Sequence, residues 1–113
     1  MHELTIAMEI LDIANDYAKK ANSSFASEIV IEVGQLSGVE YEALDFALGI
    51  SKKNTILENA VINILSIKGK AKCNNCNTEF ETDNLYSLCP SCNKYDLTFI
   101  DGKQLKVKSI TFE

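Results

Sequence analysis

The spacing of apolar residues changes repeatedly along the chain, and each change predicts a new element. Between residues 4 and 21 apolar side chains recur every three or four positions, which is the spacing of an amphipathic helix. A methionine on such a stripe is normally a core residue, so Met8 is expected to be buried. The complete expected stripe contains Leu4, Ala7, Met8, Leu11, Ala14, Ala18 and Ala21, widened by Ile6, Ile10, Ile13 and Tyr17.

The pattern changes to a period of two over residues 25–33, which predicts a strand with one buried and one partly solvated face. Ser37 is followed by Glu40 three residues later, and this spacing predicts a capping box at the start of a second helix. That helix is expected to run from about residue 39 to residue 50. Its expected core residues are Val39, Ala43, Phe46, Ala47 and Ile50.

Four further strands or short strands complete the pattern in the second half. Residues 60–67 are apolar on both faces, which favours a central position in a sheet that helices cover. Short strands are expected at 78–82 and 97–100. Residues 104–112 alternate over too great a length for a small module, so this last strand is expected to return and pair with the first sheet.

The predicted fold class is therefore α+β, with two helices on a small β-sheet and an inserted module. Residues 1–69 and 103–113 are expected to form the α/β domain. Residues 70–102 are expected to form the inserted module, which is too short to hold itself together by burying apolar surface alone.

The inserted module contains all the cysteines, arranged as two C-x-x-C pairs with twelve residues between the pairs. Two such turns supply the four soft ligands of a tetrahedral zinc site, and a set of four thiolates leaves no open position for water or substrate. The arrangement therefore predicts a zinc-ribbon-like module with structural zinc. The expected ligands are Cys73, Cys76, Cys89 and Cys92, and the backbone N–H groups expected to bond their sulfur atoms are those of Asn75, Asn77, Ser91 and Asn93.

Composition and charge exclude several other classes of protein. The net charge is −5 and none of the 11 basic residues is arginine, so the residue best suited to bind guanine and phosphate is missing. No apolar run approaches the roughly 18 residues that cross a bilayer. Two disulfides would require a secreted chain, and no secretory signal is seen. We expect a cytoplasmic protein with no nucleic-acid or membrane partner.

The single histidine, His2, lies between Met1 and Glu3. A terminal amine has a pKa near 7.7–8.0, so it becomes a nitrogen ligand at modest cost beside the imidazole. A nitrogen-rich set of this kind suits nickel(II) or copper(II) better than magnesium or calcium. Histidine is a bulky second residue, so Met1 is expected to be retained. Taken alone, a histidine at position 2 is a weak signal, because such a residue is more often an incidental surface residue than a metal ligand.

Several further motifs along the chain change this assessment of His2. The chain opens MHEL, continues IEVGQLSGVE at residues 31–40 and TILENA at 55–60, has its two C-x-x-C pairs, and then GKQLKV at 102–107. Together these resemble the HypA/HybF family of nickel metallochaperones over essentially the whole chain. The resemblance implies that His2, the Met1 amine and Glu3 bind nickel as cargo, and that the four cysteines hold structural zinc.

The same resemblance implies a non-enzymatic role in metal delivery. Nickel would pass to the large subunit of NiFe hydrogenase with the help of a GTPase of the HypB type, and in some organisms a relative serves urease. The pattern leaves open whether the protein is a monomer or a weak dimer.

Two alternative functions use the same cysteines. A zinc-ribbon binding module of a nucleic-acid or transcription complex also carries paired C-x-x-C turns, but the acidic charge and the missing arginine count against it. A thiol redox enzyme would need one exposed C-x-x-C at the start of a helix. Two pairs of matching spacing fit a metal better.

Overall fold

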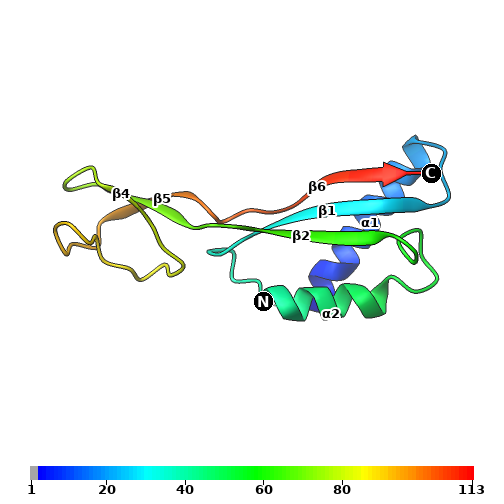
Figure 1. Ribbon diagram of the computed structural model, residues 1–113, viewed down its shortest axis with the longest axis horizontal. Coiled ribbons are helices and arrows are strands. Elements are labelled where there is room, and N and C mark those ends of the chain that lie inside the picture. Colours follow the sequence, from blue (N-terminus) through cyan, green and yellow to red (C-terminus); the bar gives the residue numbers. More distant parts are fainter. Residues whose placement is uncertain (1–2) are drawn as a thin grey trace.

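The computed structural model describes residues 3–113, so the predictions for Met1 and His2 lie outside the described residues. The molecule is elongated, with extents of 54 × 24 × 17 Å (Figure 1). Within the described range the elements are α1 (Glu3–Lys20), β1 (Ala26–Gly34), α2 (Tyr41–Ser51), β2 (Val61–Ile67), β3 (Lys70–Cys73), β4 (Glu79–Glu81), β5 (Leu97–Asp101) and β6 (Leu105–Phe112).

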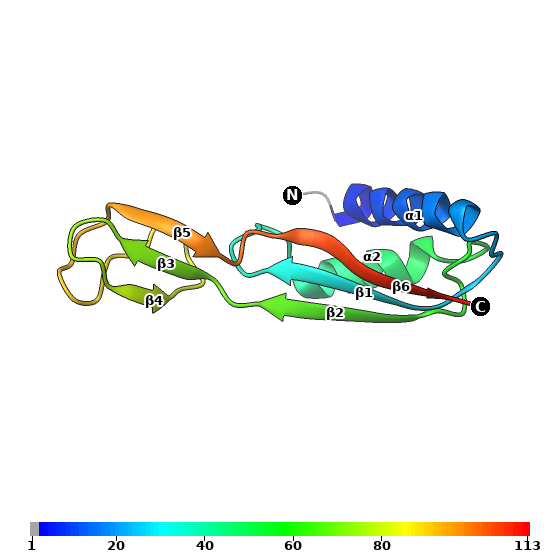
Figure 2. The same cartoon turned by 90° about the horizontal axis from the view of Figure 1, so that it is seen from above.

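The strands form two three-stranded sheets that follow one another along the long axis. The first has the order β2-β1-β6, with β1 parallel to β2 and antiparallel to β6, and the second has the order β4-β3-β5. Both helices lie on one face of the first sheet (Figure 2). The α+β class is confirmed, and so is the return of the C-terminal strand to the first sheet.

The central strand of the first sheet is β1 and not, as predicted, β2. The crossover through α2 places β2 on one side of β1, and β6 takes the other side. Ile29 and Ile31 of β1 are consequently fully buried. Because the helices cover only one face, Val61 and Leu65 of β2 are exposed, although the pattern of this strand had indicated burial on both faces.

Helix α1 is held to the sheet and to α2 by a stripe narrower than the one predicted. Ala7 and Ala14 have no exposed surface, and such small side chains let packed helices approach closely. Met8 is exposed, so its prediction as a core residue is wrong. The helix ends where Asn22 adopts a φ of 52° and Ser23 N–H donates to the Ala18 carbonyl. The buried residues of α1 are Ile6, Ala7, Ile10, Leu11, Ala14 and Ala18.

The second helix begins at Tyr41, two residues later than predicted, and the capping box is absent. Glu40 is the N-cap residue and makes no side-chain capping bond. The Ser37 hydroxyl instead accepts a hydrogen bond from the Val39 N–H at 3.2 Å, within the turn that precedes the helix. A short local bond of this kind competes with capping, because it uses the same hydroxyl oxygen.

The buried face of α2 is also rotated from the predicted one. Leu44 and Leu48 are fully buried, whereas Phe46 and Ile50, which were predicted to be core residues, are exposed. Both pairs have the spacing of one helical face, so periodicity alone does not say which pair faces the sheet. In the folded chain the leucine pair contributes to the hydrophobic core and the other pair faces outward.

Glycines and hydrogen bonds join the two sheets. Leu36 N–H donates to the Gly102 carbonyl at 2.7 Å, and Gly69 N–H donates to the Gln35 side chain at 3.0 Å. A Cβ atom at Gly34 would lie 1.9 Å from the Gly102 carbonyl oxygen, so the backbones approach too closely for any side chain. The junction is therefore a packed, hydrogen-bonded part of the fold.

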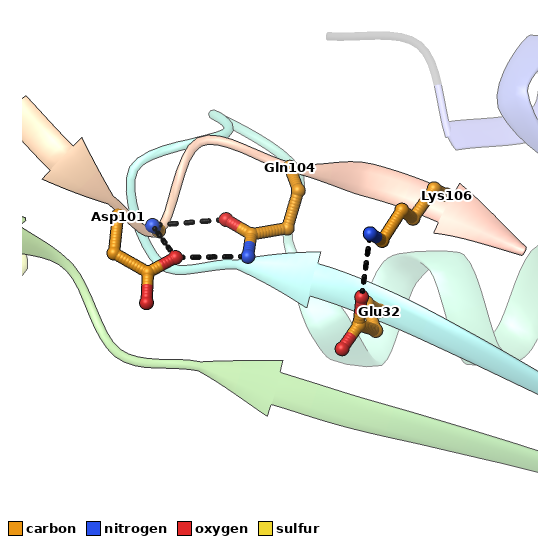
Figure 3. Close-up of polar contacts among 5 residues, drawn as sticks. Glu32, Asp101, Gln104 and Lys106 are labelled. Atoms are coloured by element: carbon orange, nitrogen blue, oxygen red, sulfur yellow. Dashed lines mark hydrogen bonds and ion pairs between the residues drawn. The ribbon is translucent and has the colours of Figure 1, made fainter. Parts of the chain in front are cut away.

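The chain leaves the second sheet through a turn that polar side chains stabilise (Figure 3). The Asp101 carboxylate accepts hydrogen bonds from the Gln104 side chain and the Gly102 N–H, both at 2.9 Å, and these bonds lower the pKa of Asp101. Beyond the turn Lys106 of β6 pairs with Glu32 of β1 at 3.3 Å. These contacts lie where the chain returns from the second sheet to the first and begins β6.

We expect Gly34→Ala to destabilise the fold by about 1–3 kcal/mol, since its new methyl group would overlap the Gly102 backbone. Gly49→Ala is the matched control, because nothing lies within 4 Å of its added Cβ and alanine favours the helix that contains it. Thermal unfolding of both variants measures the difference. A Gly34→Ala protein as stable as the wild type would contradict a tightly packed junction.

Candidate metal centre

The first cysteine pair lies in a tight turn at the end of β3. The Cys73 N–H donates to the Thr78 carbonyl at 2.8 Å, and the Asn77 N–H donates back to the Cys73 carbonyl at 2.9 Å. Asn77 has a φ of 63°, a left-handed conformation that asparagine tolerates better than most residues. The turn therefore presents Cys73 and Cys76 from one short, closed piece of backbone.

The second pair repeats this geometry. The Cys89 N–H donates to the Lys94 carbonyl and the Asn93 N–H donates to the Cys89 carbonyl, both at 2.8 Å. Asn93 has a φ of 59°. The N–H groups of both asparagines were predicted to bond sulfur atoms; in the structure they bond carbonyl oxygens and close the turns, which corrects that prediction.

The two turns bring the four cysteine sulfur atoms together. All four lie within 4.8 Å of one another, with 3.5 Å between Cys73 and Cys92 and 3.6 Å between Cys76 and Cys89. A disulfide bond would need about 2 Å, and the cysteines are free thiols. Zinc–sulfur bonds of about 2.3 Å place the sulfurs of a tetrahedral site about 3.8 Å apart. The donor set and its spacing therefore fit a zinc ion.

The surroundings of Cys76 and Cys92 favour different protonation states of the two thiols. Hydrogen bonds from the Thr78 side chain, and then from its backbone, lower the pKa of Cys76 to about 6. A backbone hydrogen bond from Lys94 favours the Cys92 thiolate, but desolvation and the other three sulfurs together raise the pKa of Cys92 to about 11. Sulfurs this close cannot all carry charge without a cation, so a divalent ion would replace the protons.

Each turn buries the first of its two cysteines more deeply than the second. Cys73 and Cys89 are fully buried, one from each turn, while Cys76 is exposed. Asn74, inside the first turn, bonds Asp96 and Thr98 through its side chain, at 3.2 and 3.0 Å. These bonds connect the metal turns to the start of β5. With four sulfur ligands present, no coordination position is left for a substrate.

Two parts of this centre were missed by sequence reasoning. Strand β3 was not predicted, although Ala71 within it is fully buried. The left-handed asparagines had a readable signal, since each C-x-x-C pair is followed directly by asparagine, at Asn77 and Asn93. An asparagine repeated at the same place after both pairs is typical of a turn that needs a positive φ.

The predicted nickel ligands are separate from this cluster in the sequence. Met1 and His2 lie outside the described residues, and Glu3 is the first residue of α1. Among residues 3–113, the acidic and cysteine side chains form a metal-sized group only at the four cysteines.

The family model for hydrogenase/urease nickel incorporation metallochaperones, HypA, matches residues 1–112. The chain belongs to the HypA family. A hydrogenase maturation factor HypA of Parabacteroides distasonis is 40% identical over 113 residues, covering 100% of this chain and 98% of the relative. One of Francisella philomiragia is 36% identical over 112 residues and covers 99% of both chains.

The fold agrees with this assignment. The solution structure of the nickel metallochaperone HypA from Helicobacter pylori superposes with a TM-score of 0.69, at 18% identity, over 99% of this chain and 97% of that one. The family membership identifies the chain as a nickel metallochaperone of hydrogenase or urease maturation and not an enzyme. It also decides against the nucleic-acid and redox alternatives. In residues 3–113 no helix is long and apolar enough to span a membrane.

Proposed function

We propose that this protein carries nickel at its N-terminus, through the Met1 amine and the backbone and imidazole nitrogens of His2, with help from Glu3. The observation that carries the proposal is the contrast between two ligand sets in a chain of this family. The cysteines form a complete sulfur set, whereas the single histidine lies beside a terminal amine. Nitrogen ligands suit nickel(II), and soft thiolates suit zinc.

The two metals then have separate places in the fold. Residues 1–69 and 103–113 form the nickel-binding domain, and residues 70–102 form the zinc-binding module. A carrier must release its cargo, so a site of few protein ligands at a chain end is better suited to nickel than a closed cage. Zinc in the module instead stabilises folding, because a piece this small buries little apolar surface.

Delivery requires partner proteins. The cargo would pass to the large subunit of NiFe hydrogenase with a HypB-type GTPase assisting, and in some organisms to urease. The exchange takes place in the cytoplasm, where thiols stay reduced and available to zinc. The relatives of the chain are hydrogenase maturation factors by name, which supports this choice of recipient.

Cells that carry His2→Ala in place of the wild-type chain should lose most NiFe hydrogenase activity, because the recipient would receive little nickel. Excess nickel in the medium should restore part of the activity, since it bypasses a delivery step but not a structural defect. Hydrogenase activity and protein level are measured together. Full activity of His2→Ala cells at low nickel would contradict the proposal, and so would a loss that nickel does not relieve at normal protein level.

A further inference from the structure

Four large apolar side chains on the two helices are exposed, although they have the spacing of buried faces. Leu4 is 56% and Met8 57% exposed on α1, while Phe46 is 72% and Ile50 54% exposed on α2. Residues four apart on a helix lie on one face, so each pair forms a short apolar ridge. We call these four residues the helix patch.

The two helices that carry the helix patch pack against each other. The N-terminal half of α1 overlaps α2 in the view of Figure 1, and the two helices are in contact. On α1 the flank with Ile13 and Tyr17 lines grooves against β6, which leaves the opposite flank, with Leu4 and Met8, on the side of α2. On α2, Phe46 and Ile50 follow Ala43 and Ala47 by three residues and share their flank.

The surroundings of the helix patch are acidic. Neither residues 3–18 nor residues 39–51 contain a lysine. The ion pairs found among the described residues involve Glu32, Glu79 and Glu81, all in strands, so the helix carboxylates take no part in them. Away from the grooves against β6, the exposed acidic residues on or beside the two helices are Asp12, Glu40, Glu42 and Asp45.

We propose that the helix patch docks the protein that receives nickel, and that this protein presents an apolar surface surrounded by lysine and arginine. Charge complementarity determines the kind of partner, because basic groups would meet the acidic helix surface. A second copy of this chain would bring two acidic surfaces together at the same place. The inference rests on the proposed nickel site, since Leu4 is two residues from His2 and a protein bound here would adjoin the cargo.

The test uses the purified precursor of the hydrogenase large subunit as the probe. Phe46→Ser and Met8→Ser should each weaken its binding about tenfold in calorimetry, because apolar residues at the centre of an interface carry most of its energy. Asp45→Lys should also weaken binding and reduce its dependence on salt. Phe25→Ser is the matched control, since Phe25 is 59% exposed and precedes β1 outside the two helices, and it should bind like the wild type.

Nickel titration of the free variants separates this inference from the proposed function. Phe46→Ser and Met8→Ser should keep wild-type nickel affinity and melting temperature. Weaker probe binding by Phe46→Ser and Met8→Ser supports docking, whatever the nickel affinity of His2→Ala. Wild-type nickel affinity of His2→Ala would reject only the proposed nickel site. Wild-type affinity of both patch variants, an equal loss in Phe25→Ser, or no binding of the probe to the wild type would overturn the docking surface. Self-association that Phe46→Ser abolishes would overturn it in favour of a dimer.

Discussion

His2→Ala is expected to remove most nickel binding while leaving zinc content and thermal unfolding as in the wild type. The substitution removes the imidazole, which is the one such ligand in the chain. Among residues 3–113 the buried core begins at Ile6, four positions beyond the substituted residue, so the fold is expected to be unaffected. Nickel titration by calorimetry, on protein with its native N-terminus and with zinc already bound, measures the effect.

A second variant tests the terminal amine separately from the imidazole. Extending the chain by a few residues before Met1 converts its amine into an amide, which is a much poorer ligand, so nickel affinity should fall although His2 remains. Glu9→Ala is the control, because it removes an exposed carboxylate of α1 without altering either nitrogen ligand. Equal nickel affinity in the wild type, His2→Ala and the extended form would move the site elsewhere.

The same ligands predict the effect of pH on the cargo. The amine and imidazole bind nickel only after losing their protons, so protons and nickel compete for the same atoms. Nickel affinity should therefore decrease steadily as the pH falls below neutrality.

The element order was predictable because each segment has a clear period. Alternation in residues 104–112 indicated a strand that needed a larger core, and β6 does pair with β1. The cysteine spacing indicated a metal site, and the four sulfurs do converge. Each prediction combines a local pattern with one physical requirement. The last strand needs a core in which to bury its apolar face, and a zinc ion needs four ligands.

The incorrect predictions concern choices that tertiary packing makes. Leu44 and Phe46 are equally apolar, and only the neighbouring α1 and sheet decide which of them is buried. The edge position of β2 depends on β6, which lies far away in the sequence. Met8 is exposed for a related reason, since the residues of α1 that enter the core lie on a neighbouring face of the helix. The residues misassigned on the helices include the four of the helix patch, together with Ile13 and Tyr17.

The second large effect is expected from Cys89→Ser. Cys89 is fully buried among the other sulfurs, and a serine hydroxyl is a poor zinc ligand. Structural zinc contributes on the order of 10 kcal/mol to the folding of such small modules, so losing it should unfold residues 70–102 at room temperature. Purified wild-type protein should contain about one zinc ion per chain, and the variant much less.

Hydrogen exchange would locate the damage. Protection should be lost first at the N–H groups of Cys73, Asn77 and Asn93, whose bonds close the two metal turns. Ser91→Ala, in the second turn but not a ligand, is the matched control and should keep its zinc. The first sheet should retain most of its protection, because its core draws on α1, α2 and β1 and on no residue of the module. A Cys89→Ser protein with full zinc content and wild-type protection would show that the four cysteines are not the zinc ligands.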